Sequence, residues 1–257
     1  HGWEGSSTST YILHTGRHLY DQGYAVFRLN LRDHGQSHHL NEGLFFITFL
    51  DEVFEAIKKA AAFSQGKAVF LAGFSLGGNF ALRVARRAQH EPIASLAHVM
   101  AISPVLDPGK STDAIDGNRL LKYYFLKKWR RSLNIKQGLY PHLYDFSGMV
   151  SLRTIRAIAC ASNEAPPYEI NINEYFGGYT LTGDFLKDVD TDMTIVISRD
   201  DPAIPFDDFP RLCLNERCDL VVHEFGGHNG FLYGLSSSTW YERRMIELFD
   251  RVSENFP

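Results

Sequence analysis

The chain has little cysteine, no long apolar run and no excess of positive charge. Its three cysteines, Cys160, Cys213 and Cys218, form neither an even disulfide set nor a zinc-binding pattern, which favours a reducing, cytoplasmic setting. No run of apolar residues approaches the length of a membrane-spanning helix. The net charge of −4 over 257 residues provides no electrostatic footprint for nucleic acid. We therefore expect a globular protein without a nucleic-acid partner.

The most informative pattern is a G-x-S-x-G sequence from Gly73 to Gly77, with Ser75 at its centre. An apolar, β-rich run at 68–72 precedes it, and an amphipathic helical stretch at 76–87 follows. This is the context of a nucleophile elbow, a sharp strand-to-helix turn that holds a serine at the top of a sheet. Glycine is needed at both positions for a steric reason: close to a serine with a strained backbone there is no space for a Cβ. We predict that Ser75 is a nucleophile.

Apolar periodicity divides most of the chain into alternating strands and helices. It predicts strands at residues 24–31, 68–72, 98–102, 193–198 and 219–223, and helices at 9–22, 46–63, 76–90 and 238–253. This alternation favours a mostly parallel, three-layer α/β sheet with helices on both faces.

One aromatic-rich segment, residues 107–190, breaks the alternation. It lies between two predicted strands, where an insertion would sit over the carboxyl ends of the sheet. We therefore predict one discontinuous core domain, residues 1–106 and 191–257, with 107–190 inserted as a cap or lid. The aromatic residues of the cap favour an apolar acyl group in the substrate, although they can equally form the core of the insertion.

A serine hydroxyl needs a base, and the base needs an orienting carboxylate. His228 is the predicted base because it follows the last strand, lies on a glycine-rich loop and comes after Ser75 in the chain. Asp201 is the predicted acid, since it follows the preceding strand and stands directly before the Pro-x-x-Pro stretch. Asp200 and Asp107 remain alternatives. The order serine, acid, histidine is the one that accompanies a nucleophile elbow.

The tetrahedral intermediate of acyl transfer also needs an oxyanion hole, usually made of two backbone N–H groups. Leu76, the residue after the nucleophile, is one expected donor. Trp3, on the glycine-rich loop at the start of the chain, is the other, through its backbone and not its indole.

Four segments together resemble the α/β-hydrolase superfamily, and most closely its YheT-like branch. They are His-Gly-Trp-Glu-Gly at 1–5, Gly-Phe-Ser-Leu-Gly-Gly-Asn at 73–79, Asp-Asp-Pro at 200–202 and Gly-Gly-His-Asn-Gly-Phe at 226–231. The resemblance implies that Ser75, Asp201 and His228 form a catalytic triad, with Trp3 and Leu76 as the oxyanion hole. It also implies structural roles for Asn79 and for the loop at 32–37.

The family has eight strands, whereas this sequence supplies about five and begins at His1 without an initiator Met. We therefore expect upstream residues that provide the remaining strands. One of these would end at His1-Gly2, between the strand at 24–31 and the strand before the elbow.

These residues predict a hydrolase that cleaves carboxylic esters through an acyl-enzyme, as an esterase or lipase without metal or organic cofactor. An acyltransferase or thioesterase using the same triad is the alternative, and a non-catalytic binding module is a third. The expected partner is a small-molecule ester.

The cap segment contains a basic amphipathic helix. Its apolar residues recur every fourth position, at Leu121, Phe125, Trp129 and Leu133. Around them stand seven basic residues and no acid, which is typical either of a helix that docks on an anionic membrane or of a solvated lid helix. The basic residues are Arg119, Lys122, Lys127, Lys128, Arg130, Arg131 and Lys136.

Overall fold

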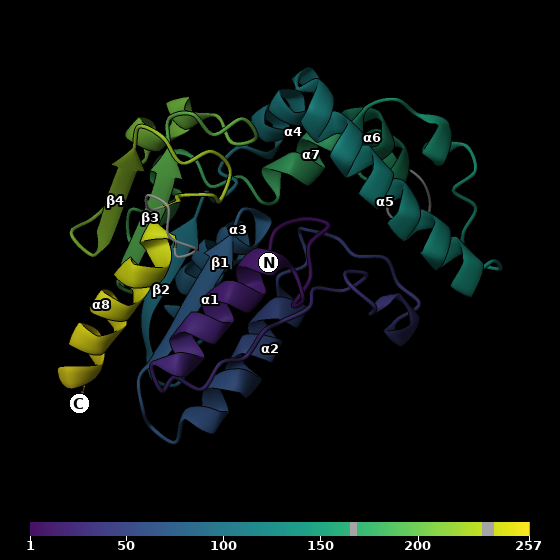
Figure 1. Ribbon diagram of the computed structural model, residues 1–257. Helices are drawn as coiled ribbons and strands as arrows, with labels where there is room; N and C mark the ends of the chain where they lie inside the picture. Colours follow the sequence, from purple (N-terminus) through teal and green to yellow (C-terminus); the bar gives the residue numbers. More distant parts are fainter. Residues whose placement is uncertain (165–168, 233–238, 257) are drawn as a thin grey trace.

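A four-stranded parallel sheet forms the centre of the molecule (Figure 1). The computed structural model describes residues 1–164, 169–232 and 239–256. The strands pair side by side in chain order, and every pair is parallel. They are β1 (Val69–Phe74), β2 (Leu96–Ile102), β3 (Met193–Ser198) and β4 (Cys218–His223). All four carboxyl ends therefore meet at one edge of the sheet, where α/β proteins place their ligands.

Helices cover both faces of this sheet, which confirms the predicted three-layer α/β class (Figure 1). On one face lie α1 (Thr10–Asp21) and α8 (Trp240–Glu254). On the other lie α2 (Asp51–Ala61) and α3 (Leu76–Ala88).

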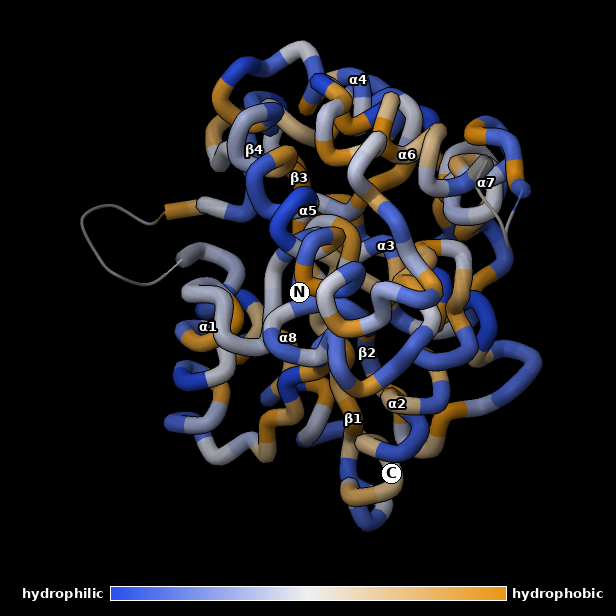
Figure 2. Tube along the Cα trace, turned by 90° about the vertical axis from the view of Figure 1, so that its right-hand side faces the viewer, coloured by the Kyte–Doolittle hydropathy of each residue, from blue (hydrophilic) through white to orange (hydrophobic). Residues whose placement is uncertain are grey.

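Side chains along β2 alternate between the two layers. Val99 and Ala101 belong to the core that includes Leu82 of α3, whereas Met100 and Ile102 belong to the core that includes Met245 of α8. A strand buried on both faces reads as a continuous apolar run, because neither set of side chains meets water. Figure 2 shows such hydrophobic segments, coloured orange, in the strands at the interior.

The predicted strand at 24–31 is wrong. None of its residues belongs to a strand, although Tyr24 to Leu31 alternate in the expected way. A strand needs a hydrogen-bonded neighbour, and among the described residues β1 pairs with β2 alone. The N–H of Leu31 instead donates to the imidazole of His1 at 3.1 Å. Phe27 and Leu29 consequently stay 61% and 40% exposed.

The predicted helix at 46–63 is also shorter than expected, since α2 begins at Asp51. The guanidinium of Arg83 donates to the carbonyl oxygens of Ile47 (2.6 Å) and Thr48 (2.7 Å). These carbonyls therefore serve as acceptors for a side chain of α3, and residues 46–50 form no helix. The predicted C-terminal helix is confirmed as α8, and its predicted start, Ser238, lies outside the described residues.

Four further helices follow β2 and precede β3, beyond the carboxyl ends of the strands (Figure 1). They are α4 (Pro108–Gly117), α5 (Arg119–Leu139), α6 (Ile155–Glu164) and α7 (Ile172–Gly177). Residues 165–168 of this insertion lie outside the described part of the chain. Short 3-10 turns occur at His38–Leu40, Ala62–Ser64, Met149–Ser151, Gly183–Leu186 and Phe206–Arg211.

A buried ion pair joins α5 to the loop after residue 31. The ammonium of Lys136 lies 2.8 Å from Asp33 Oδ1, and the two side chains are 1% and 8% exposed. Lys136 also donates to the carbonyl oxygens of Asn41 and Gly43, while Asp33 Oδ2 accepts from the N–H of Phe45. Both charges thus keep several polar partners, which a buried pair needs to offset its desolvation.

We expect the Lys136→Met variant to lose about 3–5 kcal/mol of unfolding free energy, because it leaves the carboxylate of Asp33 buried without its counter-charge. Urea denaturation followed by circular dichroism measures the change. Lys127→Met is the matched control on the same helix: its side chain is exposed, so the change should stay within about 0.5 kcal/mol. Equal stability of the two variants would contradict the structural role of the buried pair.

Candidate active site

Ser75 stands in the turn between β1 and α3 with φ 53° and ψ −116°, a conformation that L residues rarely adopt. Its N–H donates to the carbonyl oxygen of Ile102 at the end of the neighbouring strand. A Cβ at Gly73 would collide with the carbonyl oxygen of Gly77, and one at Gly77 would lie 2.7 Å from that of His1. Both glycines of the motif are therefore required by the backbone on either side of the serine.

His228 lies between Ser75 and Asp201. Its Nε2 is 3.1 Å from Ser75 Oγ, and its Nδ1 is 2.9 Å from Asp201 Oδ2. The imidazole is 18% exposed and the Asp201 side chain is fully buried. The structure thus brings together the three residues that the sequence selected as nucleophile, base and acid, from loops after β1, β4 and β3. A proton on Nδ1 donates to the carboxylate and leaves Nε2 as an acceptor for the serine hydroxyl.

The two neighbouring aspartates make different contacts. Asp201 Oδ1 accepts from the N–H groups of Ala203 (2.9 Å) and Ile204 (3.0 Å), which hold its carboxylate toward the histidine. Asp200 Oδ1 accepts from the N–H groups of Gly226 and Gly227, both at 2.9 Å. The bond from Gly227 is the largest of several that lower the pKa of Asp200.

Asp200 therefore secures the loop that carries His228 instead of touching its imidazole. Ser198 assists, because its hydroxyl donates to the carbonyl oxygen of Gly227 at 2.9 Å. The sequence analysis did not predict this support. The polar residues at the end of β3, together with the glycine-rich loop around His228, could have indicated it. The third candidate acid, Asp107, caps α4 by accepting from the N–H of Lys110.

The loop at the start of the chain lies directly beside the nucleophile. A Cβ on Gly2 would stand 3.1 Å from the Cβ of Ser75, and the N–H of Gly2 donates to the hydroxyl of Tyr11. Within the described residues, the N–H groups of Trp3 and Leu76 donate no hydrogen bond to the protein. Both groups are therefore free to bind an oxygen near Ser75.

The indole of Trp3 packs against α5. Its ring stacks on Phe125 with centroids 5.3 Å apart and meets the edge of Trp129 at 5.0 Å. Trp3, Trp129 and Phe176 also line a cavity of about 120 Å³ between the core and the inserted helices. Asn79 ties the same region together by donating to the carbonyl oxygens of Val105 and Tyr179.

Burial shifts the pKa values of Glu4 and His34, which both line this cavity. Burial raises the pKa of Glu4 to about 7, against an opposing effect of Lys128, whose ammonium donates to the carbonyl oxygen of Glu4. Burial lowers the pKa of His34 to about 4, so this imidazole is neutral at pH 7. Its Nδ1 lies 2.7 Å from the carbonyl oxygen of Arg32, and His38 contacts Ser132 on α5. Neither histidine contacts Ser75.

The described residues contain no group of three or more His, Cys, Asp or Glu side chains arranged to hold a metal ion. Among the same residues, no helix combines the length and the apolar character needed to cross a membrane. The cysteines Cys160, Cys213 and Cys218 are free thiols.

Comparison with known proteins gives a family match over the first part of the chain. The profile of the alpha/beta hydrolase fold matches residues 1–153, which hold Ser75 and the loop of Trp3. No curated protein matches the chain. The YheT-like branch therefore stays a prediction.

Solved structures resemble the whole chain at low identity. A mutant of the meta-cleavage product hydrolase CumD has 15% identity and a TM-score of 0.60, covering 98% of this chain and 89% of its own. The Pyrococcus furiosus esterase Pf2001 has 15% identity and a TM-score of 0.58, with 98% and 80% covered. Est1E from Butyrivibrio proteoclasticus, bound to ferulic acid, has 16% identity and a TM-score of 0.54, with 99% and 85% covered. These likenesses extend the shared fold beyond residue 153.

Proposed function

Because the chain belongs to the alpha/beta hydrolase fold family, we propose that it is a serine hydrolase that cleaves carboxylic esters. The observation that carries this proposal is the chain of contacts from Ser75 Oγ through His228 to the buried carboxylate of Asp201. A serine needs such a base to become nucleophilic at neutral pH, and the base needs a group that fixes its tautomer.

In the first step, Ser75 Oγ attacks the ester carbonyl carbon while His228 Nε2 takes the hydroxyl proton. The tetrahedral intermediate collapses when the C–O bond to the alcohol breaks, and His228 returns the proton to the departing oxygen. Water, deprotonated by the same nitrogen, then attacks the acyl-enzyme, and the acid leaves as the serine hydroxyl forms again. Asp201 stays ionised and stabilises the imidazolium in both steps.

The developing oxyanion is assigned to the backbone N–H groups of Trp3 and Leu76. Two features support this assignment. Neither group has another acceptor among the described residues, and Leu76 follows Ser75 while Trp3 follows Gly2, whose backbone lies beside Ser75. Donors already held in place stabilise negative charge without the reorganisation that water would need.

We assign residues 107–190 as a cap and the cavity beneath it as the acyl site. Trp3 connects this cavity to the triad, whose three residues do not line it. Its aromatic walls, Trp3, Trp129 and Phe176, suit an apolar acyl group, and its volume of about 120 Å³ favours a small one. Two structural neighbours, the esterase Pf2001 and Est1E bound to ferulic acid, agree with an ester or acid substrate.

A fluorophosphonate probe tests the proposal, because only an activated serine displaces its fluoride. We expect the folded protein to gain one phosphonyl group on Ser75 Oγ, located by mass spectrometry of the peptide, and to lose hydrolysis of p-nitrophenyl butyrate in parallel. Protein denatured before labelling is the control and should not react. Labelling elsewhere, or equal labelling of denatured protein, would contradict the mechanism. Added alcohol or thiol that captures most of the butyryl group would indicate an acyltransferase instead.

A further inference from the structure

The outer face of α5, the face turned away from the core, combines exposed apolar and basic side chains. Leu120, Tyr123, Tyr124 and Ile135 are 80%, 68%, 49% and 36% exposed. Lys127 and Arg131 stand between them along the helix and are also exposed. The opposite side of α5 is filled by buried residues such as Leu126 and Leu133. We define the outer face by its six exposed members: Leu120, Tyr123, Tyr124, Lys127, Arg131 and Ile135.

Three of the basic residues on α5 bind oxygen atoms of other segments of the protein. Lys128 donates to the carbonyl oxygen of Glu4, Arg130 to that of Leu152, and Lys136 pairs with Asp33. Lys127 and Arg131 form no ion pair with any acidic side chain in the described part of the chain. Their charges are therefore available to an external anion.

The surroundings leave these charges uncompensated. From residue 117 to residue 144 the sequence contains no aspartate or glutamate, although the chain as a whole has a net charge of −4. A local positive surface on a negative protein gives an anionic partner one preferred orientation, because the remaining surface repels it.

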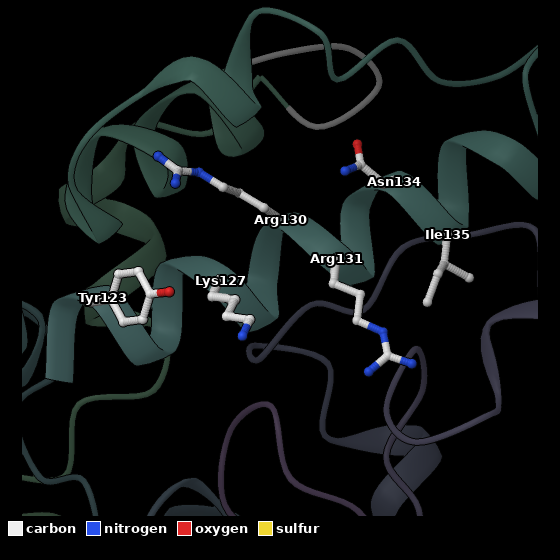
Figure 3. A pocket seen from close by; sticks show the side chains of 6 residues that line it. All are labelled: Tyr123, Lys127, Arg130, Arg131, Asn134 and Ile135. Carbon is white, nitrogen blue, oxygen red and sulfur yellow. The ribbon is translucent and has the colours of Figure 1, made fainter. Parts of the chain in front are cut away.

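The outer face is hollowed where these side chains meet. Tyr123, Lys127, Arg131 and Ile135 line a shallow depression of about 570 Å³ together with Arg130 and Asn134 (Figure 3). Figure 3 shows Lys127 and Arg131 extending to the same side of the helix, whereas Arg130 turns to the other side, toward its acceptor on Leu152. The depression lies on α5 itself and shares no lining residue with the cavity near Trp3.

We propose that the outer face of α5 docks on the surface of an anionic lipid bilayer. Lys127 and Arg131 match lipid phosphates, while Leu120, Tyr123 and Ile135 match the boundary between headgroups and acyl chains, where tyrosine is favoured. A nucleic acid would use the charges but would leave these apolar side chains in contact with water. The bilayer is the partner that uses both kinds of residue.

The same helix reaches the active site from its other side. Phe125 and Trp129 of α5 pack on Trp3, the predicted oxyanion donor. Docking through the outer face would place the bilayer on the far side of one helix from the acyl cavity. A helix of 21 residues is about 30 Å long and would lie along the membrane surface.

Flotation of the protein with phosphatidylcholine vesicles, with and without 30% phosphatidylserine, tests the proposal. We expect binding that depends on phosphatidylserine and weakens with salt. Each basic residue near an anionic surface is worth about fivefold in partitioning, so Lys127→Glu/Arg131→Glu should reduce it by about 25-fold or more. Lys59→Glu/Lys67→Glu, which reverses two exposed charges elsewhere, is the matched control and should bind as the wild type does.

A second variant, Tyr123→Ser/Ile135→Ser, keeps every charge and should still lose several-fold in binding, because it removes the apolar contacts. Hydrolysis of a soluble ester, which needs none of these residues, verifies that each variant is folded. Absence of binding, equal binding to neutral vesicles, or equal loss in the control pair would overturn the proposal. The assay works equally with Ser75→Ala, so its result is independent of the proposed serine chemistry.

Discussion

The Ser75→Ala variant is expected to lose roughly 10⁵–10⁶-fold in kcat for p-nitrophenyl butyrate, the loss typical of removing a serine nucleophile. Without Oγ no acyl-enzyme forms, and His228 has no hydroxyl to deprotonate. The residual rate should still exceed that of water by roughly 10³-fold, since the oxyanion donors and the binding site remain. Steady-state kinetics at pH 7 measures the difference.

Ser103→Ala is the matched control for this experiment. Ser103 follows β2 as Ser75 follows β1, is fully buried, and its Oγ has no hydrogen-bond partner among the described residues. Its replacement should leave kcat within about threefold, because the hydroxyl that it removes makes no hydrogen bond to lose. Thermal unfolding of both variants separates loss of chemistry from loss of fold. Retained activity in Ser75→Ala would exclude the acyl-enzyme mechanism.

The second large effect is expected for Asp201→Asn, a loss of roughly 10⁴-fold in kcat with little change in the fold. An amide at this position donates to His228 Nδ1, so the proton moves to Nε2 and the imidazole can no longer accept the proton of Ser75. The carboxylate that stabilises the imidazolium is lost in the same substitution.

Asp200→Asn provides the comparison that separates the two neighbours. Its Oδ1 accepts from two N–H groups of the His228 loop, and an asparagine keeps an oxygen able to accept both. We therefore expect a loss of about tenfold or less, which reflects a weaker hold on the loop. The reverse order of the two effects would transfer the role of orienting acid to Asp200.

The sequence was most informative where chemistry restricts the backbone. The roles of Gly73 and Gly77 could be predicted because no other residue fits beside the serine. The role of His228 could be predicted because its loop follows the last strand. The support that Asp200 gives to the loop of His228 was not predicted, because the sequence analysis considered Asp200 only as an alternative acid.

The buried ion pair could not be predicted from the sequence. Lys136 and Asp33 are 103 positions apart, and neither residue differs in its local pattern from an exposed charge. The prediction of a strand at 24–31 was wrong for a related reason. Alternation is a property of a single segment, whereas a strand forms only when another segment pairs with it by hydrogen bonds. Local patterns thus predicted the sheet and the candidate site residues, while the attachment of the inserted helices needed the structure.

The burial of Lys136 has a consequence for how a substrate would enter. If α5 swung away from the core as a lid, it would separate this ammonium from its carboxylate and its carbonyl acceptors. We infer that α5 stays packed on the core while a substrate enters the cavity.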